Sequence, residues 1–107
     1  MSIIPGTTPT LRIVLDASIK GCSTAELCIQ CDRIQILKEL ADLVISADGT
    51  VVTATLSQKD TLQLPDNKVA LVQLRVILGD AVLATNVMSV STKELLHREE
   101  LIAYGSE

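Results

Sequence analysis

The stretch from Lys68 to Thr92 carries the clearest alternation of apolar and polar positions in the chain. Its first half reads KVALVQLRVIL, and Gly79-Asp80 separates it from a second apolar segment. Period-two alternation followed by a tight turn predicts a β-hairpin with one apolar face. That face of the first strand comprises Ala70, Val72, Leu74, Val76 and Leu78.

Three earlier segments show the same alternation, over residues 11–15, 27–31 and 51–56. Each of them predicts a strand with one buried face. The side chains that we expect in the core are Leu11, Ile13, Leu27, Ile29, Val52, Ala54, Val72, Leu74, Val76, Met88 and Val90.

The segment Ile34 to Ile45 is compatible with two structures. It can form an amphipathic helix, or two short strands around Lys38 to Asp42. We prefer the strands because strands are expected on both sides of it. Asp48-Gly49 then predicts a type I′ hairpin turn, and Ser57 with Asp60 three residues later predicts one short helical turn.

The two ends of the chain carry different signals. Residues 1–9 form an extended lead-in that is rich in Pro, Gly and Thr. Ser91 followed by Glu94 has the spacing of a capping box, which predicts a C-terminal helix over 92–103. Its apolar contacts would be Leu95, Leu96 and Ile102.

These elements together predict an all-β fold: an antiparallel immunoglobulin-like β-sandwich with a short C-terminal helix, in one domain spanning residues 1–107. Composition agrees, because 48% of the residues are hydrophobic and Phe and Trp are absent. The core is therefore built from Leu, Ile, Val and Ala, and β-branched side chains pack well on a pleated surface.

The formal net charge of −4 argues against a nucleic-acid partner, because an acidic surface repels phosphates. The start of the chain lacks the pattern of a signal peptide, and no apolar run has the length of about 20 residues that spans a bilayer. We therefore expect a protein of a reducing cytoplasm, without disulfides and without a membrane partner.

Cys28 and Cys31 form a C-x-x-C pair, with Cys22 nearby. A zinc site needs about four ligands on one side of the chain, whereas in a strand these two cysteines point to opposite faces. His97, the single histidine, lies among charged residues without an evident partner. We expect no metal, no cofactor and no catalytic residue.

A possible interface is indicated by apolar side chains that we expect on the faces opposite the core. A monomer usually carries polar side chains there, and contiguous apolar patches tend to mark contacts between proteins. We therefore predict self-association, unless the C-terminal helix covers the patch. Its members are Val51, Leu71, Ile77, Leu83 and Val87.

Several segments add a family resemblance. The lead-in from Ile4 to Thr10, the segment TLSQKDTL at 55–62, the strand from Val69 to Val76 and the return from Gly79 to Asn86 follow one another in order. In that order the chain resembles a group of small proteins encoded by tailed bacteriophages and prophages of Gram-positive bacteria. Leu27, Cys28 and Ile29 stand where such proteins often carry aromatic residues.

The resemblance implies a non-enzymatic structural module of a phage tail or baseplate. Such a module would associate with copies of itself and with a larger tail protein, in the host cytoplasm during assembly and then in the virion. The alternative is a cytoplasmic adaptor or regulatory domain that captures an extended peptide at a sheet edge.

Overall fold

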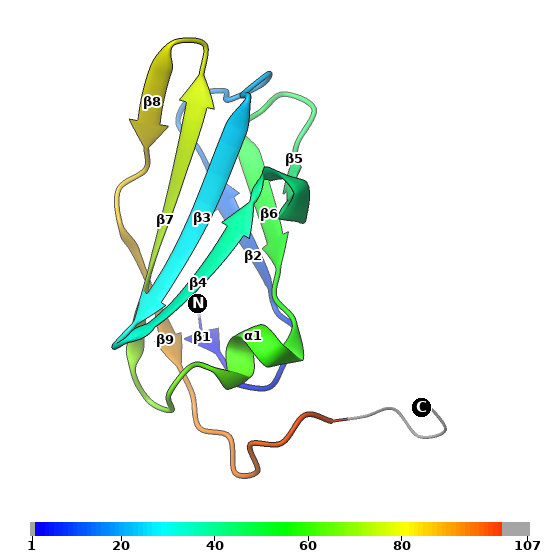
Figure 1. The fold of residues 1–107 in the computed structure, drawn as a ribbon, viewed down its shortest axis with the longest axis vertical. Coiled ribbons are helices and arrows are strands. Elements are labelled where there is room, and N and C mark those ends of the chain that lie inside the picture. The colour runs from blue at the N-terminus through cyan, green and yellow to red at the C-terminus, as the bar shows by residue number, and fades with distance from the viewer. Residues whose placement is uncertain (1, 102–107) are drawn as a thin grey trace.

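Two β-sheets face each other across one apolar core in the computed structural model, which describes residues 2–101 (Figure 1). The larger sheet has the order β1-β9-β7-β3-β4, with β8 also paired to β7, and the smaller sheet has the order β2-β6-β5. In chain order the elements are β1 (Ser2–Ile3), β2 (Thr10–Val14), β3 (Thr24–Cys31), β4 (Ile34–Glu39), the 3-10 helix η1 (Leu40–Asp42), β5 (Leu43–Ile45), β6 (Val51–Thr55), α1 (Gln58–Leu62), β7 (Val69–Leu78), β8 (Ala81–Ala84) and β9 (Met88–Thr92).

The expected core is confirmed for ten of its eleven side chains, and Met88 is half-buried. Burial alternates along β7 because successive side chains point to opposite faces of a strand. β3 pairs with β7 from Thr24↔Ile77 to Gln30↔Leu71, so the two longest strands form the centre of the larger sheet. All strand pairs are antiparallel except β1 with β9.

The segment Ile34 to Ile45 forms strands, as preferred over the helix. β4 belongs to the larger sheet and β5 to the smaller one, so η1 carries the chain from one layer to the other. Ile36 and Leu43 are buried on either side of this crossing. The crossing closes one side of the molecule between the two sheets.

The hairpin at Gly79-Asp80 is confirmed, with β7 and β8 as its strands and a positive φ of 61° at Gly79. The turn at Asp48-Gly49 is not type I′, because only Gly49 has a positive φ. Hydrogen bonds from Ser46 and Thr50 to the Asp48 carboxylate hold a longer loop between β5 and β6. The same bonds lower the pKa of Asp48 from its usual value.

The prediction of a C-terminal helix is wrong for the described residues, because 93–101 contain no helix. Ser91 lies within β9, where it pairs with Val69 on one side and Ser2 on the other. Thr92 ends the strand, and its buried hydroxyl accepts from Lys68 N and donates to the Pro65 carbonyl. Strand partners on both sides outweigh the local capping pattern, and residues 102–103 lie outside the described part.

The short helix α1 is confirmed with the predicted cap. The Ser57 hydroxyl accepts from Asp60 N, and the Asp60 carboxylate accepts from Ser57 N. Lys38 Nζ lies 2.6 Å from Asp60 Oδ2 and ties the helix to β4. The buried hydroxyl of Thr61 donates to the Thr7 carbonyl and fastens the lead-in. Neither α1 nor η1, the helices found in residues 2–101, has the length to cross a membrane.

Leu74 offers a direct test of the core, because it is 1% exposed on the central strand. Replacement by Ala should lower the free energy of unfolding by about 2–5 kcal/mol, through lost burial and the cavity left behind. The control is Leu71→Ala on the same strand, which faces outward and should cost less than about 1 kcal/mol. Chemical denaturation measures both, and equal losses would contradict this assignment of faces.

The cap of α1 gives a pH-dependent prediction. Burial acts to raise the pKa of Asp60, but hydrogen bonds from Lys38 and Ser57 outweigh it and hold the pKa below its usual value. The carboxylate therefore stabilises the fold fully above the unfolded pKa of about 3.9, and this contribution disappears as the pH falls through the lower folded pKa. Asp60→Asn should cost about 1 kcal/mol at neutral pH.

The stability difference between wild type and Asp60→Asn should therefore narrow below about pH 4. Urea denaturation at a series of pH values measures it. A difference that stays constant down to the lowest pH at which both proteins fold would contradict the role given to the carboxylate.

Candidate protein-interaction surface

The strand β2 is an edge strand, with β6 as its one neighbour among the described elements. Leu15 N donates to the Thr50 carbonyl, and Leu56 N donates to the Pro9 carbonyl. Pairing of these odd-numbered positions with β6 directs the backbone groups of Thr10, Arg12 and Val14 away from the sheet. Their N–H and C=O groups form a free edge that another strand can bind.

A β-bulge separates β8 from β9 on the far side of β7. Arg75 pairs with Ala84, and Val72 pairs with Met88, so residues 73–74 of β7 lie opposite residues 85–87. Two residues against three is the count that defines a bulge. The extra residue reverses which side chains of β8 point toward the core side.

Thr85 keeps the backbone satisfied across the bulge. Its N–H donates to the Leu74 carbonyl at 2.9 Å, and its hydroxyl accepts from Leu74 N at 3.1 Å. The Gln73 side chain donates to the Thr85 carbonyl at 2.9 Å. The bulge is therefore a fixed feature of the sheet with its own hydrogen bonds.

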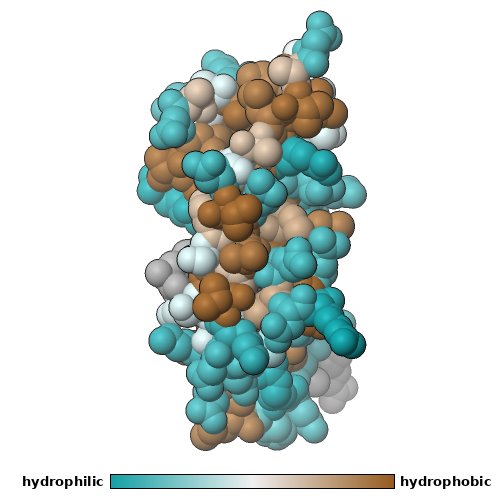
Figure 2. Space-filling model, turned by 90° about the vertical axis from the view of Figure 1, so that its left-hand side faces the viewer, coloured by the Kyte–Doolittle hydropathy of each residue, from teal (hydrophilic) through white to brown (hydrophobic). Residues whose placement is uncertain are grey.

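A groove of about 370 Å³ lies between β2 and the bulge. Its walls are mostly apolar, with Asp16, Thr85 and Asn86 as the polar lining residues. Figure 2 shows this side of the molecule, where apolar side chains gather over the upper half and extend toward the middle. The apolar side chains that line it include Ile13, Val14, Leu15, Ile19, Leu83 and Met88.

The groove is open because the two sheets differ in width. The smaller sheet ends at β2, whereas the larger sheet continues past β7 to β8 and β9. Leu83 pairs with buried Val76 and so faces the core side, yet it is 45% exposed because no strand of the smaller sheet lies beneath it. Val87, in the bulge, is 55% exposed.

The structure separates the five predicted interface residues. Leu83 lines the groove, which differs from the expected outer face because the bulge shifts the register. Val87 lies in the bulge and is exposed. Leu71 and Ile77 lie on the outer face of the larger sheet, and Val51 is half-buried on β6. The free edge of β2 is absent from that set, since strand order cannot be read from periodicity.

Among the described residues, the segment 93–101 does not supply the expected cover for Leu71 and Ile77. The chain after β9 runs extended past α1 at the opposite end of the molecule from the β7–β8 hairpin (Figure 1). Leu96 is 93% exposed there, and Leu95 lies next to Gly6. Residues 93–101 therefore cover neither the outer face of the larger sheet nor the groove.

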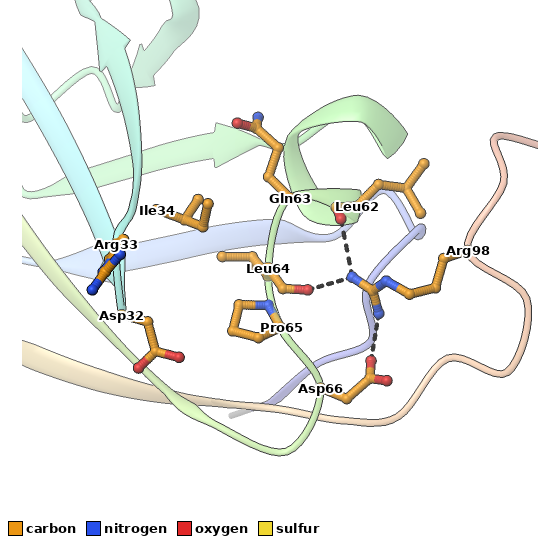
Figure 3. A pocket seen from close by; sticks show the side chains of 9 residues that line it. All are labelled: Asp32, Arg33, Ile34, Leu62, Gln63, Leu64, Pro65, Asp66 and Arg98. Atoms are coloured by element: carbon orange, nitrogen blue, oxygen red, sulfur yellow. Dashed lines mark hydrogen bonds and ion pairs between the residues drawn. The ribbon is translucent and has the colours of Figure 1, made fainter.

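A second depression is built around Arg98 of this tail (Figure 3). The guanidinium donates to the carbonyls of Leu62 and Leu64 and to the carboxylate of Asp66, which also accepts from Leu95 N. The Arg98 guanidinium is therefore hydrogen-bonded to acceptors of the protein itself, and it holds the tail against the segment 62–66. We assign this depression a structural role, in contrast to the open groove beside β2.

Cys28 and Cys31 lie on opposite faces of β3, as their spacing in a strand requires. Cys31 is buried and its Sγ is 3.7 Å from the Val69 carbonyl, while Cys28 faces the other side and contacts Gln35. Burial raises the pKa of the Cys31 thiol, and the charge of Asp32 adds to the shift. Within residues 2–101, no three His, Cys, Asp or Glu side chains come together as metal ligands, and His97 contacts Glu99 at the surface.

No protein-family model, curated protein or solved structure matches this chain.

The cysteine geometry predicts a metal-free protein in which the Cys31 thiol reacts slowly with thiol reagents. Protein purified without added metal should contain no stoichiometric zinc by elemental analysis. Cys22 and Cys28 should react with a thiol reagent faster than Cys31, because burial and a raised pKa both suppress its thiolate. Stoichiometric zinc, or labelling of Cys31 in the native protein as fast as of Cys28, would contradict the placement.

Proposed function

We propose that this protein is a non-enzymatic structural module that assembles with other protein chains through the side formed by β2 and β8. The observation that carries the proposal is the free edge of β2 next to an apolar groove. An unpaired strand supplies backbone hydrogen bonds, and the apolar wall supplies burial. The proposal involves no catalytic step and no cofactor.

The strand order supports an immunoglobulin-type sandwich. In that fold one sheet contains strands B, E and D, and the other contains G, F, C and C′. The order β2-β6-β5 corresponds to the first sheet, and β9-β7-β3-β4 corresponds to the second. Antibody domains carry a buried Trp that packs against a disulfide between the sheets. This chain has no Trp, and its three cysteines are free, so it lacks both features.

The resemblance to small phage and prophage proteins supports a place in the tail or baseplate. Its segments coincide with structural elements. The lead-in contains the loop between β1 and β2, and residues 55–62 contain the end of β6 and the helix α1. Residues 69–86 contain the β7–β8 hairpin. We propose that the protein acts in the host cytoplasm during assembly and then remains in the virion. Its partners would be itself and a larger tail protein.

A cytoplasmic adaptor that captures an extended peptide is the second candidate. The same free edge favours it, because a single added strand could pair with Thr10, Arg12 and Val14. The two functions differ in the partner. A structural module binds folded tail proteins or copies of itself, whereas an adaptor binds an isolated extended peptide as well as the whole partner.

Leu83→Lys tests the surface, because it places a charge on the apolar wall of the groove. The matched control is Leu37→Lys on β4, at a residue that is 50% exposed compared with 45% for Leu83. Both variants should remain folded. Light scattering of mixtures with candidate tail proteins should show complexes with wild type and with Leu37→Lys, and a dissociation constant at least about tenfold higher with Leu83→Lys.

Equal binding by both variants would contradict the assignment of the groove. Complexes lost with Leu37→Lys alone would instead place the interaction on the edge formed by β4.

A further inference from the structure

The two-residue strand β1 is held by few backbone contacts of its own. Among the described elements it pairs with β9 alone, and Lys93 N donates to the Ile3 carbonyl at 2.8 Å. Ile3 is nevertheless 1% exposed and belongs to the core. A strand pair this short is marginally stable by itself, so the contacts around β1 decide whether Ile3 remains buried.

The loop that follows β1 meets both α1 and the C-terminal tail at Gly6. A Cβ atom at this position would lie 2.8 Å from Leu95 Cδ2 and 3.2 Å from Leu62 Cδ2, and the φ of Gly6 is +80°. The absence of a side chain therefore lets Leu95 pack directly on the backbone of the lead-in. On the other side, the Thr61 hydroxyl donates to the Thr7 carbonyl at 2.7 Å.

Side chains rather than a strand hold this tail, which comprises residues 93–101 and contains neither helix nor strand. Arg98 donates to two backbone carbonyls at the end of α1 and to the Asp66 carboxylate (Figure 3). Gln58 of α1 exchanges two hydrogen bonds with the backbone of Leu101, each of 2.8 Å. These contacts can break without disturbing the ladder of either sheet.

The residue before the tail is fixed independently. Thr92 is 2% exposed, and its hydroxyl accepts from Lys68 N at 2.8 Å and donates to the Pro65 carbonyl at 2.7 Å. None of these groups belongs to the tail or to the lead-in. Release of the tail would therefore stop at Thr92 and leave the pairing of β9 with β7 in place.

We propose that the tail is a strap that keeps β1 in its place, with Arg98 as the residue that fastens it. When the strap is released, Leu95 leaves Gly6 and β1 separates from β9 more often. The backbone groups of β9 that pair with Ser2 and Ile3 then become an open edge. The strap thus controls access to an edge of the larger sheet, a property separate from the proposed binding side at β2 and β8.

Arg98→Gln tests the strap from the C-terminal side. The matched control is Arg75→Gln, which also removes an arginine from an ion pair, with Glu26 on the outer face of the larger sheet. Hydrogen exchange measured by mass spectrometry should be about three to ten times faster at residues 2–6 in Arg98→Gln. It should remain at the wild-type rate there in Arg75→Gln, and in β3 in both variants.

Gly6→Ala tests the same coupling from the N-terminal side, because the influence of two sites on each other is reciprocal. The matched control is Gly21→Ala, since Gly21 has a φ of +82° and open space around it. Both variants carry the same backbone strain, but only a methyl group at position 6 meets Leu95. Exchange at the hydrogen-bonded amides of Lys93, Leu95 and Leu101 should be faster in Gly6→Ala alone.

Three outcomes would overturn the proposal. The first is wild-type exchange at residues 2–6 in Arg98→Gln, which would mean that the tail does not hold β1. The second is faster exchange of β3 together with residues 2–6, which would indicate a general loss of stability. The third is equal acceleration of the tail amides in Gly6→Ala and Gly21→Ala, which would remove the contact at Gly6 as the link.

Discussion

The antiparallel pairing of β3 with β7 is the contact on which the other elements depend. Leu27 lies opposite Leu74 and Ile29 lies opposite Val72, and all four side chains are buried. β4 adds to β3, while β8 and β9 both add to β7. The described core has no aromatic side chain, so aliphatic residues fill the space between the sheets. No large ring is present that could fill the space left by a lost aliphatic side chain.

The unequal width of the two sheets links this core to the proposed function. The three-stranded sheet covers the centre of the larger sheet but does not reach β8. The uncovered margin carries Leu83, and the edge of β2 lies beside it with free backbone groups. One geometric cause therefore yields both parts of the candidate surface, the apolar wall and the unpaired strand.

Periodicity predicted what depends on local alternation. The faces of β2, β3, β6 and β7 follow from the sequence because side chains in a strand alternate between core and solvent. The cap of α1 was also predicted, since Ser57 and Asp60 interact within one turn. These features involve residues that are close together in the chain or lie within one strand.

Features that depend on distant partners were not predicted. Ser91 has the spacing of a helix cap, but pairing with Val69 and Ser2 makes it a strand residue. The bulge at residues 85–87 reverses the expected face of Leu83. No residue pattern in this segment predicts the bulge. The free edge of β2 requires the strand order itself, which alternation does not encode.

The parallel pairing of β1 with β9 has a mechanical consequence. Ser2 lies beside Ser91 and Ile3 beside Thr92, and Lys93 N donates to the Ile3 carbonyl. A force that pulls the N-terminal and C-terminal ends of the chain apart would act on β1 and β9 in opposite directions. It would slide the two strands past each other and load all their hydrogen bonds at the same time. The tail fastened by Arg98 would detach first, and the sheared pair would then resist extension before the core opened.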